Sequence, residues 1–177
     1  MCPDTLLKDK VILVVDDEED IVESVEEILP TCLVHKATDY DTAHQSLLTY
    51  TYDIVILDIM GVDGFTLLRT SVKRGFPTVM FTAHALTPDA LKKSIKLGAV
   101  FFLPKENLHA LPSFLEEVVL GGGKPLWQKF FSMIGGVFDR RLGPDWKERD
   151  QFFKAFLEEL RWSTQSNVEQ GERRDRS

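Results

Sequence analysis

The fold of this chain is decided by a stretch of ten residues, Val11-Ile12-Leu13-Val14-Val15-Asp16-Asp17-Glu18-Glu19-Asp20, or "VILVVDDEED". Its apolar half lacks polar alternation, which is typical of a strand buried on both faces of a parallel sheet. The carboxylates follow at once, although two like charges ~4 Å apart repel by roughly 4 kcal/mol at an effective dielectric near 20. Such crowding at a strand end indicates a site whose ligand offsets the repulsion.

The pattern of the first strand recurs along the chain. Further apolar runs lie at Cys32–His35, Ile54–Leu57, Thr78–Phe81 and Val100–Leu103. Amphipathic segments with helical spacing separate or follow them, at 21–29, 39–50, 65–73, 87–97 and 108–120. Thr87-Pro88 fits the start of one helix and Gly98 fits its end. Five strands alternating with five helices predict an α/β fold, a flavodoxin-like doubly wound parallel sheet of strand order 2-1-3-4-5.

The pattern changes after residue 120. We expect a compact domain over 9–120, a glycine-rich linker over 121–125, and a C-terminal helical extension. The extension reads as a helical hairpin over 126–162, in which Asp145-Trp146-Lys147-Glu148 fits a capping box. Residues 163–177 are polar and lack aromatics, and we expect them to be disordered.

Composition narrows the class of protein. The 177 residues contain no membrane-length apolar run and no signal-peptide pattern at the start, so we expect a cytoplasmic protein without a membrane partner. Residues 1–120 hold 10 Lys and Arg against 19 Asp and Glu, a net charge of −9, whereas residues 121–177 stand at +2. Nucleic acid is disfavoured as a partner, because phosphate binding needs a basic surface.

Polar side chains follow four of the predicted strands. The first strand ends in Asp16-Asp17 and the third in Asp58, and Thr82 and Lys105 follow the fourth and fifth. The carboxyl ends of parallel strands meet at one edge of the sheet, where doubly wound folds place their sites. Carboxylates suit Mg²⁺, and the ammonium of a lysine suits phosphate. The sequence therefore predicts a site for Mg²⁺ and a phosphoryl group.

Four motifs occur in order at these strand ends: "VVDDEED", "DIVILDIMGVDGF", "VMFTAHA" and "GAVFFLPKE". Together they resemble the response-regulator receiver domain of the chemotaxis-regulator type, over about residues 9–120. The resemblance implies a phosphoprotein of a bacterial two-component phosphorelay. It implies a sensor histidine kinase or phosphotransfer protein as partner, and no enzyme activity beyond self-phosphorylation and autodephosphorylation.

The resemblance also implies a role for each site residue. Asp58 is the phosphoacceptor, and Lys105 and Thr82 bind phosphoryl oxygens. The ligands of Mg²⁺ are Asp17, Asp58, the backbone carbonyl of Met60 and, mainly through water, Asp16. Thr82 and Phe102 form the conformational switch, and Met60 and His84 tune the lifetime of the phosphoryl group. The loop after Asp58 is about two residues shorter than is common in the family, which leaves its geometry open.

We interpret Glu18, Glu19 and Asp20 as helix N-terminal acids that complement the helix dipole. Several alternatives stay open. Phe102 could be a core residue instead of a switch residue. The C-terminal helices carry 9 of the 18 aromatic residues, which favours self-association, for example as a homodimer, or partner docking. A DNA-binding output at those helices, an aspartyl-nucleophile phosphatase and a receiver that has lost phosphorylation are the competing hypotheses.

Overall fold

The computed structural model describes residues 6–83 and 87–174. The chain divides into two compact units, which we call unit 1, ending at Leu126, and unit 2, beginning at Trp127. No helix within the described residues is both long and apolar enough to span a lipid bilayer.

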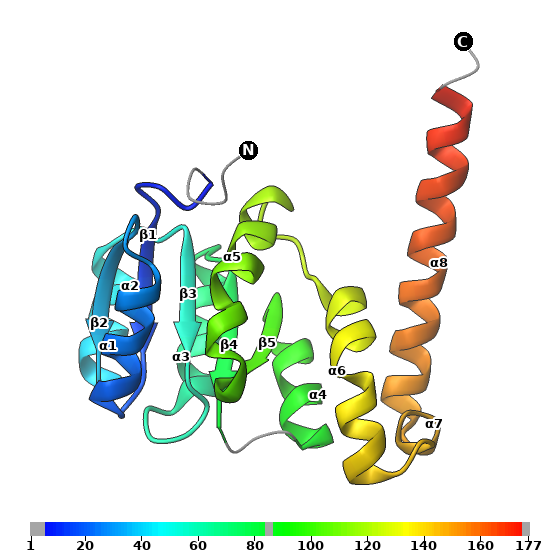
Figure 1. Cartoon of the computed structure of the whole chain (residues 1–177), viewed down its shortest axis with the longest axis horizontal. Coiled ribbons are helices and arrows are strands. Elements are labelled where there is room, and N and C mark those ends of the chain that lie inside the picture. Colours follow the sequence, from blue (N-terminus) through cyan, green and yellow to red (C-terminus); the bar gives the residue numbers. More distant parts are fainter. Residues whose placement is uncertain (1–5, 84–86, 175–177) are drawn as a thin grey trace. The chain divides into compact units, whose positions relative to one another are not determined.

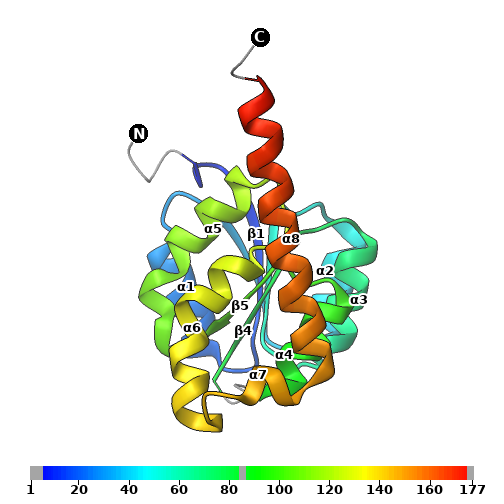
Figure 2. The same cartoon turned by 90° about the vertical axis from the view of Figure 1, so that its right-hand side faces the viewer.

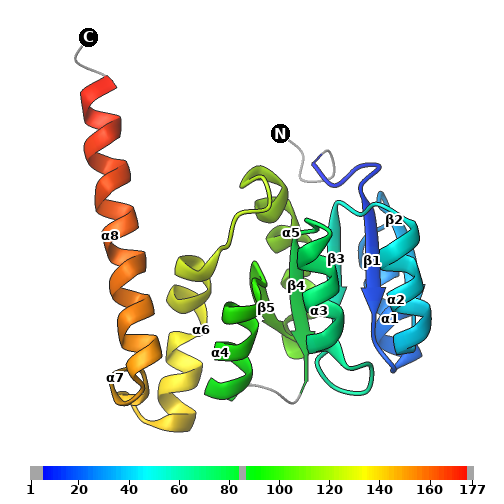
Figure 3. The same ribbon diagram turned by 180° about the vertical axis from the view of Figure 1, so that it is seen from behind.

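Unit 1 is built on one parallel sheet with the order β2-β1-β3-β4-β5, which confirms the predicted fold. Its strands are β1 (Val11–Val15), β2 (Leu33–Ala37), β3 (Ile54–Leu57), β4 (Thr78–Thr82) and β5 (Phe101–Pro104). The helices are α1 (Glu19–Ile28), α2 (Tyr40–Thr49), α3 (Gly64–Lys73), α4 (Pro88–Leu97) and α5 (Leu111–Leu120). Helices α1 and α5 cover one face of the sheet, and α2, α3 and α4 cover the other (Figures 2 and 3).

Local signals set the ends of α4 as predicted. The hydroxyl of Thr87 accepts a hydrogen bond from the N–H of Ala90 at 3.2 Å, and Gly98 ends the helix in the left-handed region at φ 95°. The predicted helix over 108–120 begins later, because a 3₁₀ segment, η2 (Lys105–Ala110), precedes α5. The side chains of all four residues of β3 and all five of β4 are buried, as a strand covered on both faces requires.

Strand register brings the predicted site residues to one level of the sheet. Val15 pairs with Leu57, and the N–H of Asp58 donates to the carbonyl of Val15 at 2.9 Å. On the neighbouring strands β4 and β5, Thr82 pairs with Pro104. The residues that follow β1, β3 and β5 and the last residue of β4 therefore share one edge of the sheet (Figure 1).

The segment predicted as a linker is held onto unit 1. The N–H of Gly123 donates to the carbonyl of Val118 at 2.9 Å, in the manner of a helix C-cap. The N–H of Leu126 donates to the carbonyl of Val100 at 2.8 Å, beside the start of β5. Unit 1 thus includes residues 121–126 as an ordered part of its structure.

Unit 2 consists of α6 (Trp127–Leu142), α7 (Trp146–Arg149) and α8 (Gln151–Arg174). Its described interior is aromatic. Phe131, Trp146 and Phe153 contact one another, with ring centroids 5.1 to 6.5 Å apart. The indole N–H of Trp146 also donates to Asp139 at 2.9 Å, which satisfies the polar atom of this buried ring.

The structure of unit 2 differs from the prediction in two ways. The capping box at Asp145 does not form, because the Asp145 carboxylate pairs with Arg149 at 3.4 Å and makes no cap hydrogen bond. The chain instead turns at Asp150, whose carboxylate accepts from the N–H of Phe152 at 2.8 Å and so begins α8. In addition, α8 continues to Arg174, into the segment predicted to be disordered.

Candidate functional site

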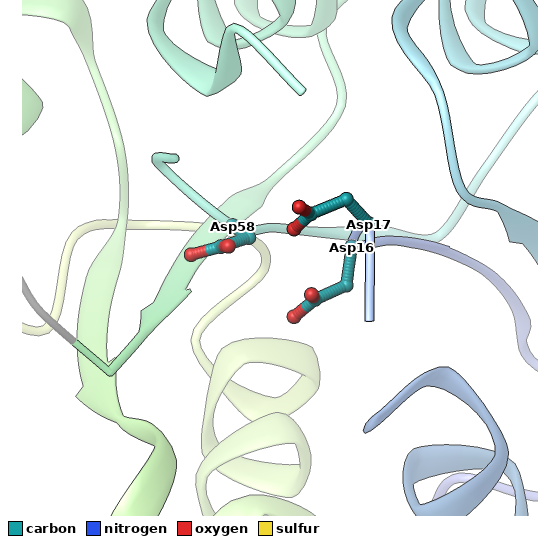
Figure 4. A group of neighbouring side chains, drawn as sticks. All are labelled: Asp16, Asp17 and Asp58. Atoms are coloured by element: carbon teal, nitrogen blue, oxygen red, sulfur yellow. The ribbon is translucent and has the colours of Figure 1, made fainter. Parts of the chain in front are cut away.

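Three carboxylates from two strand ends meet at the predicted edge of the sheet. One oxygen from each of Asp16, Asp17 and Asp58 lies within 4.8 Å of the other two. Figure 4 shows Asp16 and Asp17 leaving the end of β1, with the Asp17 carboxylate directed toward Asp58. Asp16 and Asp58 are buried and Asp17 is exposed. The cluster is therefore open to solvent on the side of Asp17.

Lys105 supplies the only positive charge that the described residues bring into ion-pair contact with this cluster. Its Nζ lies 2.7 Å from Asp16 Oδ2 and 3.4 Å from Asp58 Oδ2. The second oxygens of the two buried carboxylates also have partners, since Asp16 Oδ1 accepts from the N–H of Glu18 and Asp58 Oδ1 from the N–H of Ile59. Pairing of this kind is needed because an unpaired buried charge is strongly destabilising.

The electrostatics of the site shift two pKa values. Burial raises the pKa of Asp16 above its ordinary value and the charge of Asp58 adds to the shift, while hydrogen bonds from Lys105 and the N–H of Glu18 only reduce it. Burial alone would lower the pKa of Lys105, but the carboxylates of Asp16, Glu18 and Asp58 outweigh it and raise that pKa. Lys105 is therefore a permanent cation at neutral pH.

The short loop after Asp58 depends on two glycines. The N–H of Gly64 donates to the carbonyl of Ile59 at 3.2 Å, and a Cβ on Gly64 would overlap the backbone carbonyl of Asp58. Gly61 has φ 78°, and a Cβ there would overlap the carboxylate of Asp17. The loop therefore closes tightly against both strand ends, and its shortened length does not remove Asp58 from the cluster.

Thr82 and Phe102 lie on neighbouring strands and on the same face of the sheet. Met80 pairs with Phe102 and Thr82 pairs with Pro104, so the four side chains point to one side. Thr82 is only 1% exposed, and its Oγ1 has no hydrogen-bond partner among the described residues. An unsatisfied buried hydroxyl costs ~1–3 kcal/mol, which indicates a ligand for it. Phe102 is fully buried.

The residues present fit a divalent cation. Asp16, Asp17 and Asp58 carry three negative charges against the single positive charge of Lys105, and their oxygens are hard ligands of the kind that Mg²⁺ prefers. Met60 lies in the loop two residues after Asp58, with an exposed side chain, and its role as a carbonyl ligand stays a prediction. His84 lies outside the described residues.

Sequence reasoning missed one participant in the site. Glu18 was predicted to be a helix N-terminal acid, and it stands at the N-cap of α1 without a side-chain cap hydrogen bond. Its Oε1 lies 2.9 Å from Lys105 Nζ. Its position directly after Asp16-Asp17, before the helix, is the signal that could have revealed it.

A comparison with protein-family models decides the family. Residues 12–115 match the model of the response regulator receiver domain. The chain belongs to this family. The match runs from the second residue of β1 through β5 into α5, and it contains the acidic cluster. A receiver domain is consistent with two-component signalling, and receiver domains bind Mg²⁺ at an acidic site. No curated protein matched the chain.

Solved structures share the receiver fold. A CheY-like receiver domain from Methanospirillum hungatei is 22% identical, with a TM-score of 0.54, and the match covers 62% of this chain and 96% of that one. A response regulator from Thermotoga maritima is 21% identical, with a TM-score of 0.57 and coverage of 63% and 98%. A signal receiver domain of a DNA-binding response regulator from Colwellia psychrerythraea is 26% identical, with a TM-score of 0.55 and coverage of 63% and 98%.

Proposed function

We propose that this receiver domain accepts a phosphoryl group on Asp58 from a histidine kinase or a phosphotransfer protein. The observation that carries the proposal is the meeting of Asp58 with Asp16, Asp17 and the Lys105 ammonium at one edge of the sheet. In the transfer, an oxygen of Asp58 bonds to phosphorus as the bond from phosphorus to the donor's imidazole nitrogen breaks. The imidazole keeps that electron pair and takes a proton.

Each residue of the site has a part in this step. Asp16, Asp17 and Asp58, with the carbonyl of Met60, would hold Mg²⁺, which supplies positive charge to the phosphoryl oxygens. Lys105 is close enough to Asp58, at 3.4 Å, to follow the phosphoryl group once it is attached. Phosphoryl transfer needs mainly positioning and charge neutralisation, which these groups provide.

The response to phosphorylation runs through Thr82 and Phe102. A phosphoryl group adds a charge of about −2 and strong acceptors, which give the buried hydroxyl of Thr82 a partner. Since Thr82 and Phe102 share one face of β4 and β5, movement of the first changes the packing around the second. The two residues therefore form the switch.

The experiment is incubation with acetyl phosphate and Mg²⁺. We expect about one phosphoryl group per chain, labile to hydroxylamine and absent in Asp58→Asn, because the acyl phosphate forms on that carboxylate. Many turnovers of assorted phosphate esters would indicate the phosphatase instead. Complete absence of label in the wild type would show a receiver that has lost phosphorylation.

We place the output in unit 2, as a protein–protein contact or self-association. Two apolar side chains of this unit, Met133 and Trp162, are exposed, the latter at 71%. A DNA-binding output is poorly supported, because residues 127–177 carry 10 Lys and Arg against 9 Asp and Glu. The test is the solution mass of the full chain with and without beryllofluoride and Mg²⁺. An unchanged mass would leave a separate partner as the output.

A further inference from the structure

The ammonium of Lys105 lies closer to two other carboxylates than to the phosphoacceptor. Its Nζ lies 2.7 Å from Asp16 and 2.9 Å from Glu18, but 3.4 Å from Asp58. A lysine has three N–H donors, and here Glu18 and Asp58 accept hydrogen bonds from Nζ while Asp16 forms an ion pair with it. The two shorter contacts go to carboxylates that do not receive the phosphoryl group.

Glu18 is held where it can reach Lys105. Its backbone N–H donates to Asp16 Oδ1 at 3.0 Å, and it stands as the N-cap residue of α1. Its side chain is 59% exposed, whereas the side chain of Lys105 is 7% exposed. The contact therefore lies at the mouth of the site, where the buried ammonium meets solvent.

We propose that Glu18 is a positioning residue that holds the Lys105 ammonium beside Asp16 and competes with the phosphoryl group for it. The inference rests on the proposed function of Asp58. A phosphoryl group on Asp58 draws the ammonium toward its own oxygens, and the contact with Glu18 must lengthen or break. Glu18 thus favours the unphosphorylated state and keeps Lys105 oriented while Asp58 is unmodified.

The exposure of Glu18 sets the expected change in affinity for a phosphoryl mimic when this residue is replaced. Half-exposed ion pairs are weak, and losing one changes an equilibrium constant by about two- to fivefold. Replacing Glu18 should therefore tighten the binding of a phosphoryl mimic by that factor. A merely structural role for Glu18 as the N-cap would not change the binding in this direction.

The first experiment measures the affinity of the full chain for beryllofluoride in Mg²⁺. Glu18→Gln is compared with Glu19→Gln, which removes the same charge one residue further along, in the first turn of α1. We expect Glu18→Gln to lower the apparent Kd about two- to fivefold relative to Glu19→Gln. With Lys105→Met in the background, the two variants should be equal. Equal effects with Lys105 present, or weaker binding by Glu18→Gln, would overturn the proposal.

A second measurement separates this inference from the proposed function. Urea unfolding of metal-free Glu18→Gln, Lys105→Met and the double variant forms a cycle that needs no phosphorylation. We expect the unfolding equilibrium constants to be non-additive by about two- to fivefold. Additive effects would refute the ion pair even if Asp58 is labelled. Coupling together with an unlabelled Asp58 would refute the proposed function and leave the ion pair standing.

Discussion

The two units of this chain are stabilised differently. In unit 1 a five-stranded sheet fixes the level of every strand end, so residues far apart in sequence arrive at one edge. In unit 2 no strand is found among the described residues, and aromatic rings on three helices pack against one another. In a sheet, backbone hydrogen bonds fix where the side chains of a site lie, whereas in unit 2 the helices are positioned mainly by the packing of aromatic rings. The site accordingly lies in unit 1.

The largest expected effect is a loss of stability that is confined to unit 2. Phe153→Ala should lower the stability of unit 2 by about 3–5 kcal/mol, because it empties a buried aromatic position. All three tryptophans lie between residues 127 and 162, so tryptophan fluorescence reports on unit 2. Labelling of Asp58 by acetyl phosphate should persist. Loss of labelling in Phe153→Ala, but not in the exposed control Lys154→Ala, would show that the units depend on each other.

A pair of glycine substitutions tests whether the backbone of unit 1 is more tightly constrained than that of unit 2. Gly64→Ala should destabilise unit 1 by about 3 kcal/mol, because its Cβ would overlap the carbonyl of Asp58. Gly136→Ala, in α6, has open space around it and should stabilise unit 2 by about 1 kcal/mol. Urea unfolding followed by tyrosine absorbance reports on unit 1, since all three tyrosines lie there. Equal effects of the two substitutions would contradict the tight loop.

The substitution Thr82→Val tests whether Thr82 takes part in the switch. Removing a buried hydroxyl without a partner among the described residues should stabilise unit 1 by about 1 kcal/mol. The same variant should weaken the response to beryllofluoride, measured as the change in amide chemical shifts around Phe102. Thr78→Val is the contrasting variant, since the Thr78 hydroxyl is hydrogen-bonded to Ser71 at 2.7 Å and its loss should destabilise. A stabilised Thr82→Val with an undiminished response would exclude Thr82 from the switch.

The smallest expected effect concerns Asp39, the N-cap of α2. Its carboxylate accepts from the N–H and the hydroxyl of Thr42, which lowers the pKa of Asp39 below its ordinary value of 3.8. A lowered pKa stabilises the folded state above the pKa of the unfolded chain, and this gain is lost as pH falls through the folded value. Asp39→Ala should therefore lower Tm at pH 7, with a smaller difference below pH ~4. Asp39→Asn should keep the cap at both pH values.

Much of the structure of unit 1 could be predicted from short stretches of sequence. The apolar run 11–15 and the carboxylates after it predicted a buried strand and its site, and the pairing of Val15 with Leu57 then aligned Asp16 with Asp58. In unit 2 the break at Asp150 was not predicted, because its cap competes with the earlier capping-box pattern at Asp145. Without a sheet to fix the register, only the packing of the helices selects between two such local patterns.

The sequence by itself located the five strands and the ends of β1 and β3, because a run of apolar residues is a property of a short segment. Strands β2, β4 and β5 end one or two residues beyond the predicted apolar runs, because their ends depend on pairing with neighbouring strands. Only the tertiary structure decided that Lys105 contacts Asp16 and Glu18 more closely than Asp58. Glu18 and Lys105 are 87 positions apart, and the contact depends on the direction of two long side chains across a packed edge. No local pattern encodes that direction, because it results from the simultaneous packing of β1, β3 and β5.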